Sequence, residues 1–241
     1  MAGHSKWSNI KHRKGAQDAK RGKIFQKHSK LIYQAAKDGG SDIEMNAALR
    51  LAVDKARSDN MPNDNIERAI KRATDAGQGD DYNEVIYEGY GTNGIAVLVY
   101  TLTDNVNRTA TNVRVAFDRN GGSMGEKGSV NYMFDRKGYI AIAREGLDVD
   151  EDTMLMHVLE AGGEDLEVSD DVFEIYTEAT DFGAVRDALI EEGFELDRAE
   201  LTMIPQTMIP VPEDKLSVFE KMIEALEDDD DVNEVYHNAE I

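Results

Sequence analysis

Cysteine is absent from this chain of 241 residues, and its absence removes several kinds of chemistry at once. Without a thiol the chain has no disulfides, no thiolate zinc sites and no cysteine nucleophile. Such a composition is typical of a reducing compartment, where disulfides are rare. We therefore expect the protein to act in the cytoplasm.

Long apolar runs are also missing. The longest, residues 95–100, is far shorter than the roughly 20 residues that a helix needs to cross a bilayer. The basic N-terminal segment is not followed by the apolar stretch that a secretory signal requires. The sequence thus predicts no membrane association and no secretion.

The whole chain has a net charge of −21, and basic residues are scarce in its later part. Residues 1–72 contain 16 Lys and Arg against 8 Asp and Glu, whereas residues 145–241 contain 4 against 31. An acidic surface repels a phosphate backbone, so a bound nucleic acid would have to lie at the basic end.

Catalytic motifs are absent as well. The sequence has no nucleophile elbow, no paired zinc-binding histidines and no phosphate-cradling lysine loop. Residues 89–94 match the G-x-G-x-x-G pattern, but the β-branched run 95–100 follows where a dinucleotide site needs a helix. We interpret residues 89–94 as a hairpin turn and expect neither enzymatic activity nor a cofactor.

Two acidic runs are poor candidates for metal binding. Residues 148–152 resemble the start of a calcium loop. However, Thr153 stands at the sixth position, where the loop requires glycine, and Leu159 stands at the twelfth, where it requires a bidentate glutamate. Residues 227–231 are interpreted as a solvated connection between a helix and a strand. We expect no resident metal ion.

Apolar residues recur at helical spacing in the first part of the chain. Helices are expected over residues 18–38, 46–59 and 63–76, after an arm of residues 1–17. Pro62 separates the second helix from the third, which Asn63 is expected to cap. Residues 1–79 are therefore predicted to form a basic arm and a helical bundle.

Short strand-like runs alternate with helical runs after residue 80. Residues 135–204 have the βαββαβ order of a ferredoxin-like unit and are acidic. The block 80–134 lacks a closing helix and strand, which the tail supplies over residues 214–226 and 232–237. The predicted fold is α+β, with an N-terminal helical bundle followed by two ferredoxin-like α/β sandwich domains. One of these is discontinuous (80–134 plus 205–241), and the other (135–204) is inserted into it.

The N-terminal segment has the composition of a nucleic-acid-binding surface. Lysine and arginine neutralise phosphates, and aromatic rings stack on bases. Four of its lysines share one face of the first expected helix: Lys20, Lys23, Lys27 and Lys30. The predicted contact residues are Lys6, Trp7, Lys11, His12, Arg13, Lys14, Lys20, Arg21, Lys23, Lys27 and Lys30. A solvated charged helix with a disordered tail explains the same composition, so that alternative stays open.

Several motifs resemble those of the YebC-type regulator family. They are Met1-Ala2-Gly3-His4-Ser5-Lys6-Trp7, residues 18–23, Met61-Pro62, residues 87–91, residues 103–109 and Gly128-Ser129-Val130. The chain departs from the family pattern at Thr92-Asn93, where a Pro-Gly-like turn is common, and at Met124, where Leu is usual.

The resemblance implies three domains and a cytoplasmic role in gene expression, as a probable DNA-binding transcriptional regulator. It equally admits a ribosome-associated translation factor that binds ribosomal RNA. The charge pattern leaves a third interpretation open, in which the acidic domain is a protein-interaction surface and the arm is only a tail.

Overall fold

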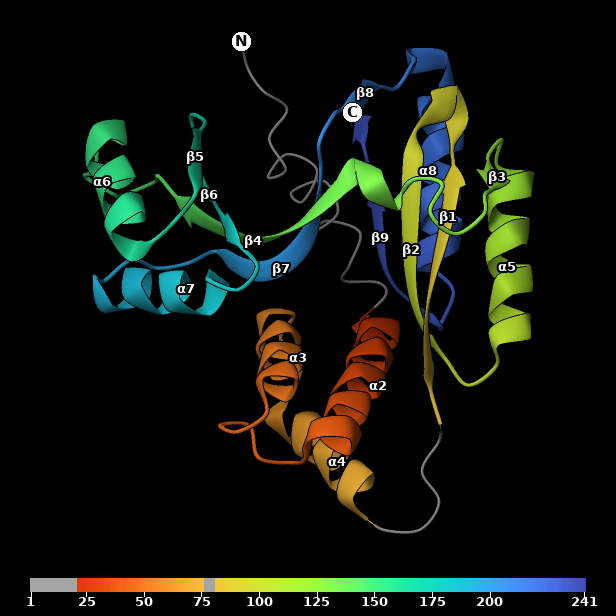
Figure 1. The fold of residues 1–241 in the computed structure, drawn as a ribbon, viewed down its shortest axis with the longest axis horizontal. Helices are drawn as coiled ribbons and strands as arrows, with labels where there is room; N and C mark the ends of the chain where they lie inside the picture. The colour runs from red at the N-terminus through yellow and green to blue at the C-terminus, as the bar shows by residue number, and fades with distance from the viewer. Residues whose placement is uncertain (1–20, 76–80) are drawn as a thin grey trace. The chain divides into compact units, whose positions relative to one another are not determined.

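The computed structural model describes residues 21–75 and 81–241, and its first elements are three helices (Figure 1). They are α2 (Arg21–Gly39), α3 (Ala47–Ser58) and α4 (Asn63–Thr74). Asn46 caps α3 by accepting the Leu49 amide at 3.0 Å, and its own amide group donates to the carbonyl of Ala35 at 2.8 Å. The expected cap at Asn63 is wrong, because Asn63 is already helical and Pro62 precedes it without a side-chain bond. The three helices pack around the buried side chains of Ile32, Ala36, Leu49, Val53, Ala56, Met61, Ile66 and Ala69.

A four-stranded sheet follows the bundle in the same compact unit. The elements are β1 (Asn83–Tyr90), η2 (Thr92–Gly94), β2 (Ala96–Thr103), α5 (Val106–Arg119), β3 (Ser123–Met124) and η3 (Asn131–Met133). Residues 207–241 add β8 (Ile209–Pro210), α8 (Glu213–Glu227), β9 (Val232–His237) and β10 (Ala239–Glu240). The strand order is β3-β1-β2-β9, so the sheet is built from two separate stretches of chain.

The two helices of this sheet domain, α5 and α8, pack against each other and against the sheet. Their shared core includes Val97, Val99, Val113, Phe117, Phe219, Met222 and Val235. The connectivity differs from the βαββαβ order of the expected ferredoxin-like domain. A tight turn joins β1 directly to β2, in which the Gly91 amide donates to the carbonyl of Ile95 at 2.7 Å. The hairpin predicted for residues 89–94 is thereby confirmed, and it leaves no room for a helix between the first two strands.

Residues 134–206 form a second compact unit. It contains β4 (Phe134–Ala143), α6 (Glu151–Ala161), β5 (Asp165–Val168), β6 (Val172–Glu178), α7 (Phe182–Glu191) and β7 (Arg198–Pro205). The strands are antiparallel in the order β5-β6-β4-β7, and α6 packs against α7. The described residues thus form a mixed α/β fold with two antiparallel four-stranded sheets, beside a short parallel pairing of β8 with β10.

A buried carboxylate fixes the loop between β3 and β4. Glu88 on β1 accepts hydrogen bonds from the amides of Gly128, Val130 and Asn131 at 2.6, 2.7 and 2.8 Å. Burial alone would raise the pKa of Glu88, but these three donors and the nearby Lys127 outweigh it and lower the pKa. The loop is therefore held by the ionised side chain.

Within the described ranges, 21–75 and 81–241, no helix combines the length and the apolar character that crossing a membrane requires.

Candidate nucleic-acid interface

Three lysines project from one face of α2. Lys23, Lys27 and Lys30 are separated by four and three residues, which places them on successive turns of the same face. Ile32 and Ala36 on the opposite face are buried in the bundle core. We term Lys23, Lys27 and Lys30 the lysine row.

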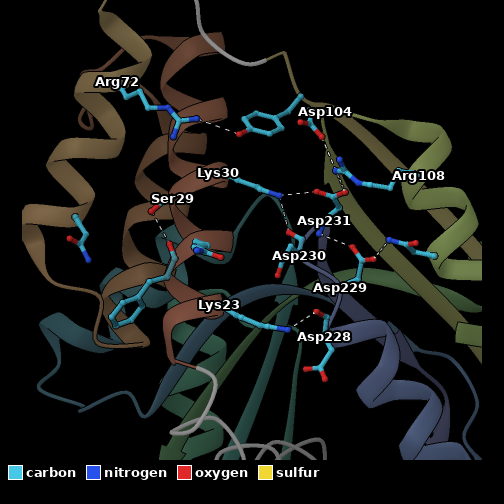
Figure 2. Close-up of a pocket in the computed structure, with 15 residues that line it drawn as sticks. Lys23, Ser29, Lys30, Arg72, Asp104, Arg108, Asp228, Asp229, Asp230 and Asp231 are labelled. Carbon is cyan, nitrogen blue, oxygen red and sulfur yellow. Dashed lines mark hydrogen bonds and ion pairs between the residues drawn. The ribbon is translucent and has the colours of Figure 1, made fainter.

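The lysine row contacts the acidic segment, defined as residues 227–231, where α8 ends. Figure 2 shows the contacts of Lys23 and Lys30. Lys23 Nζ donates to the main-chain oxygen of Asp228 at 3.1 Å, and Lys27 Nζ donates to that of Glu227 at 2.5 Å. The last carbonyls of a helix lack intrahelical partners and carry partial negative charge. The two ammonium groups therefore cap the C-terminal end of α8.

Asp231 is the most connected member of the acidic segment. Its carboxylate accepts from Lys30 Nζ at 2.8 Å, from Thr103 Oγ1 at 3.1 Å and from Thr109 Oγ1 at 3.0 Å. Arg108 forms a further hydrogen-bonded ion pair with the same carboxylate. Because Thr103, Arg108 and Thr109 all belong to the sheet domain, Lys30 alone of these four donors comes from the bundle.

The surroundings of Asp231 favour its ionised form. Burial alone would raise its pKa, but hydrogen bonds from Arg108 and Lys30 outweigh burial and lower the pKa from 3.8 to about 2. For the pKa of Lys27, burial outweighs the neighbouring charges. Burial lowers the pKa of its ammonium group, and the carboxylates of Glu227 and Glu234 act against that shift.

The contact between bundle and sheet domain is largely polar. Besides the lysine row, Lys55 pairs with Glu234, and Tyr33 meets Tyr82 edge to face at 5.8 Å between ring centroids. Among the described residues, the bundle core and the sheet core have no member in common. Long charged side chains therefore account for much of this contact.

Basic side chains from three helices lie at a cleft beside these contacts. Lys30 from α2, Arg72 from α4 and Arg108 from α5 line it together with most of the acidic segment (Figure 2). Arg72 donates to the hydroxyl of Tyr82 at 3.4 Å. The cleft is therefore mixed in charge rather than uniformly positive.

The predicted contact residues divide between described and undescribed parts of the chain. Lys6, Trp7, Lys11, His12, Arg13, Lys14 and Lys20 lie outside the described residues. Arg21 is exposed in the first turn of α2. Lys23, Lys27 and Lys30 share a face, as their spacing predicts, but this face binds oxygens of the chain itself. Their contact with nucleic acid stays a prediction.

Sequence reasoning missed the partner of the lysine row. Residues 227–231 were expected to be a solvated connection, which is wrong for Asp231, because only 3% of it is exposed. Asn105 caps α5 by accepting the Arg108 amide at 3.1 Å, and Arg108 and Thr109 in the first turn of α5 also bind Asp231. The sequence contains a row of lysines and an acidic run, but nothing in either indicates that they pair.

Within residues 21–75 and 81–241, no group of three or more His, Asp or Glu side chains is arranged to hold a metal ion.

Comparison with known proteins identifies the family. The model of the TACO1/YebC protein N-terminal domain matches residues 5–76, and the model of the TACO1/YebC second and third domain matches residues 82–239. A probable transcriptional regulatory protein of Enterococcus faecalis is 67% identical over 240 residues, covering 100% of this chain and 99% of that protein. One of Lactobacillus delbrueckii subsp. bulgaricus is 64% identical over 239 residues, covering 99% and 98%.

A solved structure agrees with these matches. The crystal structure of a conserved hypothetical protein, Aq1575, from Aquifex aeolicus is 40% identical and aligns with a TM-score of 0.81, covering 93% of this chain and 92% of that one. The two family models together match most of the sequence, and the chain belongs to the TACO1/YebC family.

Proposed function

We propose that this chain is a non-enzymatic regulator of gene expression that binds nucleic acid through its basic N-terminal part. The observation that carries the proposal is the separation of charge, with 16 basic and 8 acidic residues in 1–72 against 4 and 31 in 145–241. A polyanion releases counterions when it binds the basic end, and the acidic remainder repels it. The relatives named probable transcriptional regulatory proteins support the regulatory role.

The proposed contacts form two groups. The first supplies phosphate contacts and stacking surfaces from residues 6–20: Lys6, Trp7, Lys11, His12, Arg13, Lys14 and Lys20. The second consists of Arg21 and the lysine row on α2. Because the row already binds a series of oxygen atoms, its spacing suits an oxygen-rich backbone, and a nucleic acid must compete for it.

The proposal also includes a cytoplasmic location and three domains, with residues 1–79 as the binding module. The acidic unit of residues 135–204 would then orient the complex by repelling the bound polyanion.

Salt-dependent binding of the full-length chain to a labelled 20-base-pair duplex DNA tests the proposal. If about 5 to 8 phosphates are contacted, log K falls against log salt with a slope of about −4 to −7. A single-stranded RNA of the same sequence is measured in parallel. Tighter binding to that RNA would assign the regulator to RNA and favour a role in translation.

A triple variant, Lys6→Gln with Lys11→Gln and Lys14→Gln, locates the site. We expect its slope on duplex DNA to be shallower by about 2 to 3, because three phosphate contacts are lost. The matched control removes the same charge from three exposed lysines elsewhere: Lys127, Lys215 and Lys221. An equal effect of both variants, or no binding by the wild-type chain, would overturn the proposal.

A further inference from the structure

We propose that the acidic segment, residues 227–231, is an internal competitor that occupies the lysine row and is displaced when nucleic-acid phosphates bind there. This inference rests on the proposed function and adds its regulation. The contact in Figure 2 is then a closed state of the binding surface, not a permanent contact between the bundle and the sheet domain.

The acidic segment presents the same chemistry as a phosphodiester backbone. Lys23, Lys27 and Lys30 each donate to an oxygen of consecutive or nearly consecutive residues, at distances of 2.5 to 3.1 Å. The main-chain oxygens lie at the negative end of α8, among the carboxylates of the same segment. A row of ammonium groups thus faces a row of oxygens in a negative field, as it would on a nucleic-acid strand.

The contact is of a kind that can open. Lys23 and its bond to the main-chain oxygen of Asp228 are exposed, and such contacts contribute little stability and are screened by salt. Lys27 and the Lys30–Asp231 pair are partly buried, with 22% of the Lys30 side chain and 4% of the Asp231 side chain exposed. The bundle core and the sheet core have no member in common, so separation parts Tyr33 from Tyr82 but divides neither core.

Both faces of the contact stay folded when they part. On the sheet side, Asp231 keeps Thr103, Arg108 and Thr109 as donors after Lys30 leaves. On the bundle side, α2 keeps its packing on α3 and α4. Opening therefore requires no unfolding, and a nucleic acid meets a preformed lysine row.

Competition lowers the apparent affinity by the fraction of molecules in which the row is open. Weakening the acidic segment should therefore tighten nucleic-acid binding without any new contact. It should also steepen the salt dependence, because salt opens the wild-type contact while it weakens binding of the polyanion.

The test uses a full-length variant with three conservative changes, Glu227→Gln, Asp228→Asn and Asp230→Asn, which keep Asp231 and the main-chain acceptors and remove three negative charges beside the lysine row. The control removes the same charge from exposed positions of the 134–206 unit, through Asp148→Asn, Asp152→Asn and Glu160→Gln. Both are titrated with the 20-base-pair duplex and with single-stranded RNA of the same sequence. Circular dichroism establishes that both are folded as the wild type is.

We expect the acidic-segment variant to bind about fivefold or more tightly than the control, with the steeper salt slope. Adding Lys23→Gln, Lys27→Gln and Lys30→Gln should abolish that gain. Equal affinity of variant and control would overturn the internal competition while leaving the proposed function intact. Absence of binding by all the proteins, wild type included, would overturn the proposed function and this inference with it.

Discussion

Asp231→Asn is expected to loosen the sheet domain where β2, α5 and β9 meet. The wild-type carboxylate accepts from Lys30, Thr103, Thr109 and Arg108. Asparagine keeps one acceptor oxygen but replaces the other by an NH₂ donor, which faces further donors. The charge that strengthens the bonds from Lys30 and Arg108 is lost as well.

The magnitude follows from the lowered pKa of Asp231. A shift from 3.8 to about 2 corresponds to about 2 kcal/mol of stability at neutral pH. Because the pKa is lower in the folded state, this contribution is fully present above pH 3.8 and is lost as the pH falls through about 2. The variant lacks this contribution at every pH.

Hydrogen exchange followed by mass spectrometry measures the effect locally. In peptides covering residues 98–119 and 229–238, we expect about 30-fold faster exchange in Asp231→Asn than in the wild type at pH 7. The ratio should approach one as the pH falls from 5 to 2. Asp230→Asn is the matched control, since Asp230 is exposed and binds Lys30 through its main-chain oxygen. A ratio below about threefold at pH 7, or one independent of pH, would refute the reasoning.

Two further substitutions test the loop and the second unit. Glu88→Gln should speed hydrogen exchange of the 125–133 amides about tenfold to 100-fold at pH 7, since it leaves a buried amide donor unpaired. Because the pKa of Glu88 is lowered, the difference from the wild type should fade as the pH falls below 4.5, and an unchanged rate would contradict the role of Glu88 in holding the loop. Gly138→Ala should destabilise the 134–206 unit by about 1–3 kcal/mol, because a Cβ there would lie 2.2 Å from Thr177 Oγ1 and 2.7 Å from Phe182 Cδ2. Calorimetry should show a lower melting temperature for that unit only. Gly183→Ala is the control, because no atom lies within 4 Å of the added Cβ, and an equal effect of both substitutions would argue against crowding at residue 138.

Secondary structure was largely readable from the sequence, because the pattern that defines an element lies within the element. The helix expected over 46–59 is α3, Ala47–Ser58, and the strand expected over 232–237 is β9 with the same bounds. Connectivity was harder. The hairpin between β1 and β2 was identified, yet the ferredoxin-like order was still assigned to that domain, since strand order within a sheet depends on partners far apart in sequence.

The candidate site was predictable on one side only. Helical spacing placed Lys23, Lys27 and Lys30 on one face, but their partners lie about 200 residues away in the chain. The run 227–231 has the same composition whether it is solvated or paired, so composition could not reveal the contact. Asp231 differs from its neighbours only in its surroundings, which are set by Thr103, Arg108 and Thr109 across the folded sheet domain.

Because β2 pairs with β9, the sheet domain can be completed only late in synthesis. A growing chain completes the whole 134–206 unit before the second neighbour of β2 exists. In the part of the chain that the structure describes, the strands of that unit pair only with one another, so the unit can fold early. During that time one edge of the nearly buried β2 has no partner strand. Bare apolar edges are sites of aggregation. Slow or interrupted translation beyond residue 206 should therefore leave nascent chains that associate through β2.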